Sequence, residues 1–265
     1  MIALLPGNLE LAYDEAGSGL PLLFIHGWPH NRTLWSAQLS GLSTHARCLA
    51  PDLRGFGGST VSGPYSVAQY ADDLVAFLDS LGIDRAVVCG LSMGGYVAMA
   101  MLRHHRDRVR ALILTSTRAT ADTPEAREKR MRLIAYVREE GVEALASRQL
   151  RAMVGETTFT SRPEPLEELR RLMADAPLEG VVGGLQAMAD RPDSTALLAT
   201  LETPTLVIGG AEDTFTSPAE LGAMAAGIPN ARLELIATAG HVCAFERPAA
   251  FNHLVAEFLE RLISN

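Results

Sequence analysis

Short apolar runs alternate with longer amphipathic stretches along most of this chain, and this alternation restricts its fold more than any other feature. The apolar runs lack regularly spaced polar positions, which is typical of parallel strands covered on both faces. The longer stretches have the spacing of helices that cover such a sheet. We therefore predict an α/β fold with a mostly parallel sheet and strands at residues 22–25, 48–50, 86–89, 111–114, 205–208 and 233–236.

Turn and cap residues add further elements to this prediction. Gly17-Ser18-Gly19 separates the runs 9–15 and 20–25, which predicts an antiparallel hairpin at the edge of the sheet. Ser66 precedes a stretch with one apolar face and is expected to cap a helix. The helices predicted outside the central part of the chain cover residues 66–82, 93–105 and 248–263.

The strand pattern disappears between residues 117 and 203, where Arg, Glu, Ala and Leu recur with helical spacing. A single crossover helix needs far fewer residues. We expect residues 118–203 to form a helical cap over a site and residues 1–117 and 204–265 to form the core; a run of ordinary crossover helices is the alternative. The expected cap helices are 124–140, 142–153, 165–174 and 179–190, separated by Gly141, by Gly155 with residues 157–162, and by Pro177.

The composition limits the partners and the compartment. Of the 265 residues, 48% are hydrophobic, which is enough for a large core without disulfides or a structural metal. The 23 basic and 31 acidic residues give a net charge of −8 without a basic cluster, so no nucleic-acid partner is expected. No apolar stretch is long enough to span a membrane, residues 1–10 lack the features of a signal peptide, and we expect a cytoplasmic chain. Cys48, Cys89 and Cys243 form no CxxC pair and are expected to be free thiols.

A candidate nucleophile lies in the segment Gly90-Leu91-Ser92-Met93-Gly94-Gly95, between the run 86–89 and a helical stretch. At such a strand-to-helix turn the glycines allow strand and helix to approach closely while the serine hydroxyl is exposed. The start of the helix also directs backbone N–H groups at an anion formed beside the serine. Ser92 is therefore predicted to be a nucleophile; a serine that caps the helix is the alternative.

A serine hydroxyl needs a base, and the base needs an acid that orients it. His241 follows the strand 233–236 and Gly240, at the carboxyl end of the sheet where α/β proteins place their sites, and it is predicted to be the base rather than a plain loop histidine. Asp213 follows the strand 205–208 and is the predicted acid, with Glu212 as the alternative. Five further histidines are assigned to helix surfaces, packing or loops: His26, His45, His104, His105 and His253.

Two glycine-rich loops complete the predicted site. After the strand 22–25 the chain reads His26-Gly27-Trp28-Pro29, and we assign the two N–H donors of an oxyanion hole to Trp28 and Met93, with His26 ordering the loop. The loop 52–59 contains Asp52 and Arg54, which are expected to hold each other and the neighbouring turns. This loop has no GK[ST] sequence and is interpreted as architectural rather than as a phosphate site.

These motifs, in this order, resemble those of the α/β-hydrolase superfamily. The resemblance implies an eight-stranded, mostly parallel sheet with a cap inserted after the sixth strand. It rests on HGWP at 26–29, DLRGFGGS at 52–59, GLSMGG at 90–95, GAED at 210–213 and AGH at 239–241.

Within the superfamily the serine-nucleophile branch is the best match. HGWP is also similar to epoxide hydrolases and haloalkane dehalogenases, but those enzymes use an aspartate where this chain has Ser92, which argues against both. DLRGFGGS, LDSLGI at 78–83 and CGLSMGG at 89–95 look most like the group of 3-oxoadipate enol-lactonases, small carboxylesterases and cofactor-free haloperoxidases.

The resemblance implies hydrolysis of small carboxylic esters or lactones through an acyl-Ser92 intermediate, without cofactor or metal. The alternatives are hydrolysis of a C–C bond beside a ketone, perhydrolysis, and a non-catalytic ligand receptor on the same scaffold. The cap arginines leave a carboxylate-bearing lactone open as the substrate, and the sequence does not indicate an oligomeric state. Apolar cap side chains that suit a pocket are Met131, Tyr136, Met153, Phe159, Met173 and Met188.

Overall fold

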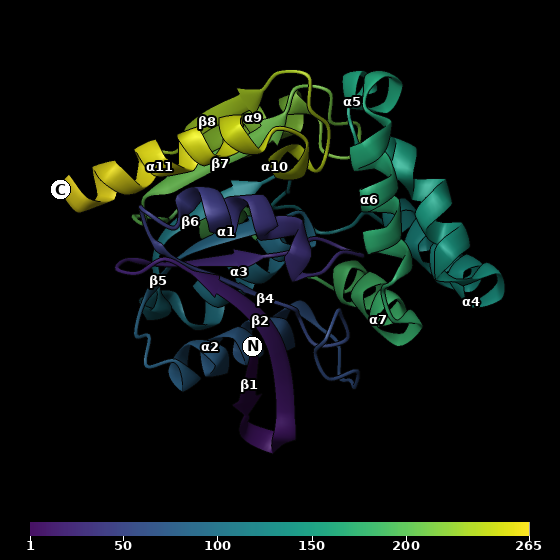
Figure 1. The fold of residues 1–265 in the computed structure, drawn as a ribbon, viewed down its shortest axis with the longest axis horizontal. Coiled ribbons are helices and arrows are strands. Elements are labelled where there is room, and N and C mark those ends of the chain that lie inside the picture. Colours follow the sequence, from purple (N-terminus) through teal and green to yellow (C-terminus); the bar gives the residue numbers. More distant parts are fainter. Residues whose placement is uncertain (265) are drawn as a thin grey trace.

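The predicted apolar runs form the centre of one twisted sheet in the computed structural model, which describes residues 1–264 (Figure 1). Within these residues the sheet has eight strands in the order β1-β2-β4-β3-β5-β6-β7-β8. All pairs from β4 to β8 are parallel, which confirms the predicted fold class. The strands are β1 (Ile2–Leu5), β2 (Leu9–Ala16), β3 (Pro21–Ile25), β4 (Arg47–Pro51), β5 (Ala86–Leu91), β6 (Val109–Thr115), β7 (Thr205–Gly210) and β8 (Arg232–Ile236).

Both faces of the sheet are covered, as the unbroken apolar runs predict. In β3, Leu22 and Phe24 pack with helices α1 (Ser36–Leu42) and α11 (Pro248–Ser264). Leu23 and Ile25 point to the opposite face and join the core with α2 (Val67–Ser80) and α3 (Met93–His104). Successive side chains of a strand point to opposite faces, so a strand covered on both sides has no polar positions.

The predicted N-terminal hairpin is wrong. Strand β2 does not pair with β3; it pairs antiparallel with β1 and with β4, and β4 lies between β2 and β3. The glycines after β2 make a connection to β3 rather than a hairpin turn, because both edges of β3 are occupied by the parallel strands β4 and β5. The actual hairpin joins β1 to β2 through the turn η1 (Pro6–Asn8).

Outside residues 118–203, the sequence correctly predicts the helices that have a long apolar face. α2, α3 and α11 match the predicted helices, and the Ser66 hydroxyl accepts a hydrogen bond from the Gln69 N–H at 3.0 Å as the cap of α2. The sequence does not predict the short helices, since fewer than three turns leave little periodicity. They are η2 (Arg32–Trp35), α1, η3 (Arg106–Arg108), α9 (Pro218–Ala226) and α10 (Cys243–Glu246).

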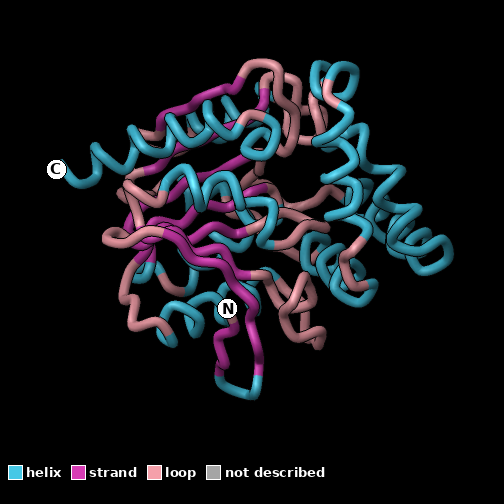
Figure 2. Tube along the Cα trace, in the orientation of Figure 1, coloured by secondary structure: helices cyan, strands magenta, loops and turns pink. Residues whose placement is uncertain are grey.

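Residues 118–203 are here named the helical insertion, and its helices from α4 (Pro124–Met153) to α7 (Leu178–Ala189) lie together at one side of the sheet (Figures 1 and 2). Gly141, with φ of 85°, interrupts α4 at the predicted position. The sequence does not predict the short helices α5 and α8, and the division of the chain into a core and a cap stays a prediction. The insertion contains α4 (Pro124–Met153), α5 (Glu156–Ser161), α6 (Pro163–Ala174), α7 (Leu178–Ala189) and α8 (Thr195–Leu198).

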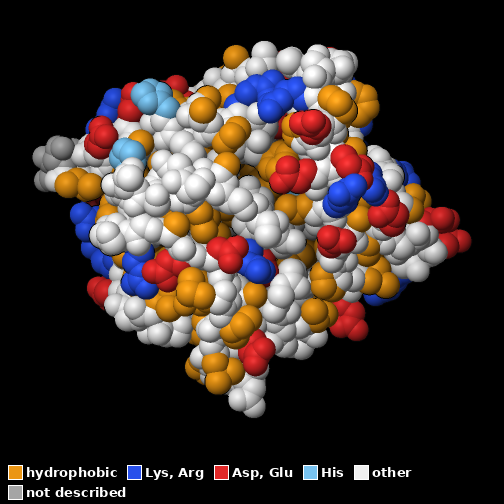
Figure 3. Space-filling model, viewed as in Figure 1, with side chains coloured by type: hydrophobic (Ala, Val, Ile, Leu, Met, Phe, Trp, Pro, Cys, Tyr) orange, Lys and Arg blue, Asp and Glu red, His pale blue; other side chains and the backbone are white. Residues whose placement is uncertain are grey.

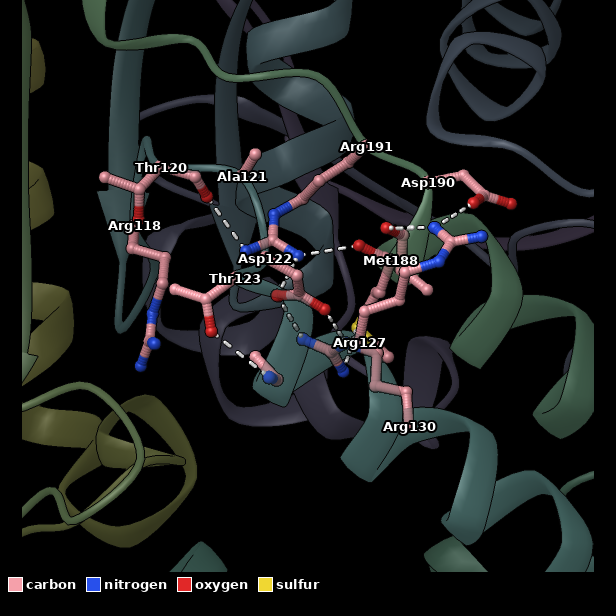
Figure 4. Close-up of polar contacts among 12 residues, drawn as sticks. Arg118, Thr120, Ala121, Asp122, Thr123, Arg127, Arg130, Met188, Asp190 and Arg191 are labelled. Carbon is pink, nitrogen blue, oxygen red and sulfur yellow. Dashed lines mark hydrogen bonds and ion pairs between the residues drawn. The ribbon is translucent and has the colours of Figure 1, made fainter.

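A buried ion pair joins the two segments through which the insertion leaves and rejoins the core. Arg191, after α7, lies 2.6 Å from Asp122, before α4, and the two side chains are 3% and 4% exposed. Arg130 of α4 pairs with the same carboxylate at 2.5 Å, so two guanidinium groups converge on Asp122 (Figure 4). Burial alone would raise the pKa of Asp122, but the two arginines outweigh it and hold this pKa below its ordinary value.

Within residues 1–264, no helix is long and apolar enough to cross a membrane. The same residues contain no group of three His, Cys, Asp or Glu side chains placed to hold a metal ion.

Replacing Asp122 with Asn should lower the free energy of unfolding by about 3 kcal/mol, because it leaves two buried or half-buried arginines without a counter-charge. Urea denaturation monitored by circular dichroism measures this change. The control is Arg132→Gln, which removes an exposed pair with Glu128 and should change the stability by less than about 1 kcal/mol. Wild-type stability in Asp122→Asn would contradict the importance assigned to the buried pair.

Candidate active site

Ser92 occupies a strained turn between β5 and α3. Its φ of 53° is in the left-handed region, which is uncommon for a residue with a side chain. The neighbouring glycines are required by space: a Cβ on Gly94 would lie 2.2 Å from the Ile25 carbonyl oxygen, and one on Gly90 would lie 2.3 Å from that of Gly94. The Ser92 side chain makes no capping hydrogen bond to α3, so the helix-cap alternative is not supported. The turn instead presents Ser92 to a cavity.

His241 and Asp213 form a buried pair beside the same cavity. The Nδ1 atom of His241 lies 2.9 Å from Oδ2 of Asp213, and both Ser92 and His241 line the cavity. The other Asp213 oxygen accepts hydrogen bonds from the backbone N–H groups of Phe215 and Thr216 at 2.8 and 3.0 Å. Burial would raise the pKa of Asp213, but His241 and these N–H groups outweigh it and lower the pKa. The ionised carboxylate therefore favours the tautomer of His241 in which Nδ1 carries the proton and donates a hydrogen bond to Asp213. The Nε2 atom takes no part in this hydrogen bond.

Glu212, the alternative acid, points elsewhere. Its carboxylate accepts hydrogen bonds from the N–H and the hydroxyl of Thr157, at 3.1 and 2.9 Å, and the N–H bond is the main cause of its lowered pKa. Thr157 belongs to α5, so Glu212 ties the loop after β7 to the helical insertion. The structure thus brings Asp213, and not Glu212, to His241.

The loop after β3 lies directly against Ser92. A Cβ built on Gly27 would be 3.4 Å from the Cβ of Ser92. His26 orders this loop, as expected: its Nδ1 lies 2.9 Å from the Gly27 carbonyl oxygen and its Nε2 accepts the Leu53 N–H at 3.0 Å. Burial lowers the pKa of His26, so its ring is the neutral tautomer with the proton on Nδ1.

The two N–H groups assigned to an oxyanion hole belong to residues at this junction. Met93 is the first residue of α3, and the N–H of a first helical residue has no acceptor within the helix. Trp28 lines the cavity, and its indole Nε1 donates to the Val181 carbonyl of α7 at 2.9 Å, which fixes the loop against the insertion.

The loop 52–59 is architectural, but its predicted internal ion pair is wrong. Asp52 pairs with Arg32 and accepts the N–H groups of Arg32 and Gly58, at 2.6 and 2.7 Å. Arg54 instead pairs with Asp73 of α2, at 2.6 Å. The Asp52 side chain is fully buried, and the Arg54 side chain, which is 11% exposed, is directed to Asp73 of α2.

Two side chains near the site are not identified by the sequence. Glu246 of α10 is buried and accepts the N–H groups of Gly240 and Gly155 at 2.7 and 2.9 Å, so it holds the residue before His241 against the insertion. His30 is buried, and neither of its ring nitrogens bonds to a described residue. Burial, with His26 and His241 nearby, lowers the pKa of His30 to about 3, so its ring is neutral at neutral pH. Neither residue lies in a recognisable motif.

The cavity has a volume of about 870 Å³ and lies between the ends of the strands and the helical insertion. Tyr136, Met153 and Met188, which the sequence suggests as pocket residues, line it. Met131 and Met173 pack into the apolar cores instead, and Phe159 is exposed. From the sheet side the cavity is lined by Trp28, Ser92, Tyr96, Phe215, Thr216 and His241.

This fold, with a serine turn after β5 and an Asp–His pair after β7 and β8, is that of an α/β hydrolase. The model of the alpha/beta hydrolase fold family matches residues 21–248, and the chain belongs to this family.

Three relatives cover almost all of the chain. It is 31% identical over 241 residues to 3-oxoadipate enol-lactonase 2 of Acinetobacter baylyi, covering 91% of this chain and 88% of the relative. It is 29% identical to 2-hydroxymuconate semialdehyde hydrolase of a Pseudomonas species, covering 97% and 92%. The solved structure of a thermophilic esterase from Thermogutta terrifontis, with malate bound, has 42% sequence identity and a TM-score of 0.95, covering 99% and 98%.

Replacing Asp213 with Asn should reduce kcat for ester hydrolysis on the order of 10³- to 10⁴-fold, because an amide can hold His241 in the wrong tautomer. The matched change in the adjacent residue, Glu212→Gln, should reduce it less than about tenfold, since Glu212 contacts Thr157 and not His241. Steady-state kinetics on a p-nitrophenyl ester compares the two. A larger loss of kcat in Glu212→Gln than in Asp213→Asn would show that Glu212, and not Asp213, is the acid.

Proposed function

We propose that this protein is a serine hydrolase that cleaves carboxylic esters or lactones of small molecules through an acyl-Ser92 intermediate. The observation that carries the proposal is the buried Asp213–His241 pair on the cavity into which the strained turn presents Ser92. The similarity to an enol-lactonase and to an esterase favours the same reaction class.

In the proposed acylation, Oγ of Ser92 attacks the substrate carbonyl carbon while Nε2 of His241 takes the hydroxyl proton. Asp213 stabilises the imidazolium that forms. When the tetrahedral intermediate collapses, the bond to the leaving oxygen breaks and His241 gives its proton to that oxygen. The alcohol then leaves, or in a lactone remains attached to the acyl group.

Deacylation repeats these steps with water. His241 takes a proton from a water molecule whose oxygen attacks the acyl carbon, and the proton returns to Oγ of Ser92 as the ester bond to the enzyme breaks. The net reaction is ester plus water to acid plus alcohol, so the proposed steps balance without a cofactor or a metal.

The negative oxygen of each tetrahedral intermediate requires donors that are already in place. We assign this role to the N–H groups of Trp28 and Met93. The ordering of the Trp28 loop by His26 and by the Trp28–Val181 hydrogen bond supports this assignment, because fixed donors need no reorganisation during the reaction.

Residues 118–203 are proposed to be the cap, and residues 1–117 and 204–265 the core. The insertion supports this role because it forms one wall of the cavity that contains Ser92.

A cytoplasmic location is also part of the proposal. It is supported by Cys48, Cys89 and Cys243, which are buried free thiols. Burial raises the pKa of Cys48 and of Cys243 to about 12, so the reactive thiolate is scarce.

The second candidate function is hydrolysis of a C–C bond beside a ketone, which the similarity to 2-hydroxymuconate semialdehyde hydrolase favours. The sequence also leaves open perhydrolysis with hydrogen peroxide and a non-catalytic ligand receptor. Rates on matched ester, vinylogous diketone and peroxide substrates separate the chemistries, and the lack of labelling by a fluorophosphonate probe in folded protein would favour the receptor.

Changing Ser92 to Ala should abolish both hydrolysis of p-nitrophenyl acetate and fluorophosphonate labelling, because the attacking oxygen is removed. The control Ser40→Ala removes an exposed hydroxyl in α1 and should retain both activities. Labelling does not depend on release of p-nitrophenol, so the two readouts are independent. Wild-type turnover in Ser92→Ala would refute the acyl-serine mechanism.

A further inference from the structure

The cavity beside Ser92 is cationic although the whole chain is acidic. The net charge is −8, yet no Asp or Glu side chain is found among the described residues that line this cavity. On the face shown in Figure 3, acidic and basic side chains are interspersed over the helical insertion. The charged side chains of the cavity lining, in contrast, are all cationic. The cationic lining residues are Arg118, Lys129, Arg130, Arg132 and Arg148.

Four of these five cations come from α4, which folds back on itself at Gly141. The Arg148 guanidinium lies 4.6 Å from the centre of the Tyr136 ring, although the two residues are twelve positions apart. On a straight helix they would be separated by about 18 Å. The reversal at Gly141 therefore places cations from both halves of α4 on one wall of the cavity.

Three of the five cations already have carboxylate partners. Arg130 pairs with Asp122 and Arg118 lies 3.4 Å from Glu220. Arg132 pairs with Glu128 where both side chains are more than 60% exposed, an arrangement that contributes little.

Lys129 and Arg148 differ from these three. Within residues 1–264, neither has a carboxylate oxygen within the 4.0 Å of an ion pair; the exposed Glu125, one turn before Lys129 on α4, interacts with Lys129 from a longer distance. The stacking of Arg148 on Tyr136 also restricts its guanidinium without using its N–H donors. Two positive charges on the cavity wall are thus available to an anion that enters it.

We infer that the substrates of this cavity carry a carboxylate in addition to the ester or lactone group, and that Lys129 and Arg148 bind it. This inference rests on the proposed function, because Ser92 and His241 define the reacting end of the cavity. A carboxylate that reaches these two cations gains charge-assisted hydrogen bonds from them. Leu133, Met153 and Leu185 provide apolar contacts for the carbon chain between the two groups.

Monomethyl succinate and methyl butyrate test the inference, since they differ only by a carboxylate in place of a methyl group. Acid release in a pH-stat gives kcat/KM for each ester. The wild type should prefer monomethyl succinate about tenfold, and added NaCl should reduce this preference because Lys129 and Arg148 are exposed to solvent.

The double variant Lys129→Gln/Arg148→Gln should lower the ratio of the two kcat/KM values about tenfold, mainly through the KM of the anionic ester. The matched control is Arg138→Gln, which removes an exposed cation of α4 outside the cavity and should leave the ratio unchanged. A wild-type ratio of one or less, or an unchanged ratio in the double variant, would overturn the inference.

Direct binding of succinate separates this inference from the proposed function. If neither ester is hydrolysed, the proposed function fails, and calorimetry with succinate alone decides about the cationic site. Binding to the wild type that weakens about tenfold in the double variant supports the site, whereas no binding to the wild type, or equal binding to both proteins, overturns it.

Discussion

The left-handed backbone of Ser92 is the constraint on which the rest of the site depends. Holding a serine at a φ of 53° between a buried strand and a helix requires glycine at positions 90 and 94, because neighbouring backbone leaves no room for a Cβ. This turn presents the side chain to the cavity. The parallel pairing of β5 through β8 then brings the loops that carry Asp213 and His241 to the same edge.

The helical insertion is tied to three loops of the site by separate hydrogen bonds. Trp28 donates to α7, Glu212 accepts from α5, and Glu246 links the residue before His241 to Gly155. The ion pair of Asp122 with Arg191 joins the segment before α4 to the segment after α7. The wall of the cavity is therefore positioned by the same loops that position the reacting groups, and its shape and its charge are set together with the geometry at Ser92.

Much of this arrangement could be predicted from the sequence because it is local. Buried strands leave unbroken apolar runs, and Ser92, Asp213 and His241 each closely follow such a run. The errors concern long-range partners: β4 inserts between β2 and β3, and Asp52 pairs with Arg32 rather than Arg54. Asp122 and Arg191 are far apart in the sequence and are brought together by the folded insertion, and the cationic wall depends on the reversal of α4 at Gly141. No periodic pattern in the sequence predicts either feature.

The central claim is that catalysis passes through a covalent ester on Ser92, and rapid acid quenching followed by peptide mass spectrometry tests it most directly. During the first turnover of p-nitrophenyl acetate, we predict a burst of p-nitrophenol and a matching amount of acetyl group on the peptide that contains Ser92. Product formation with the acetyl group on another residue, or with no acetylated peptide at any quench time, would contradict it.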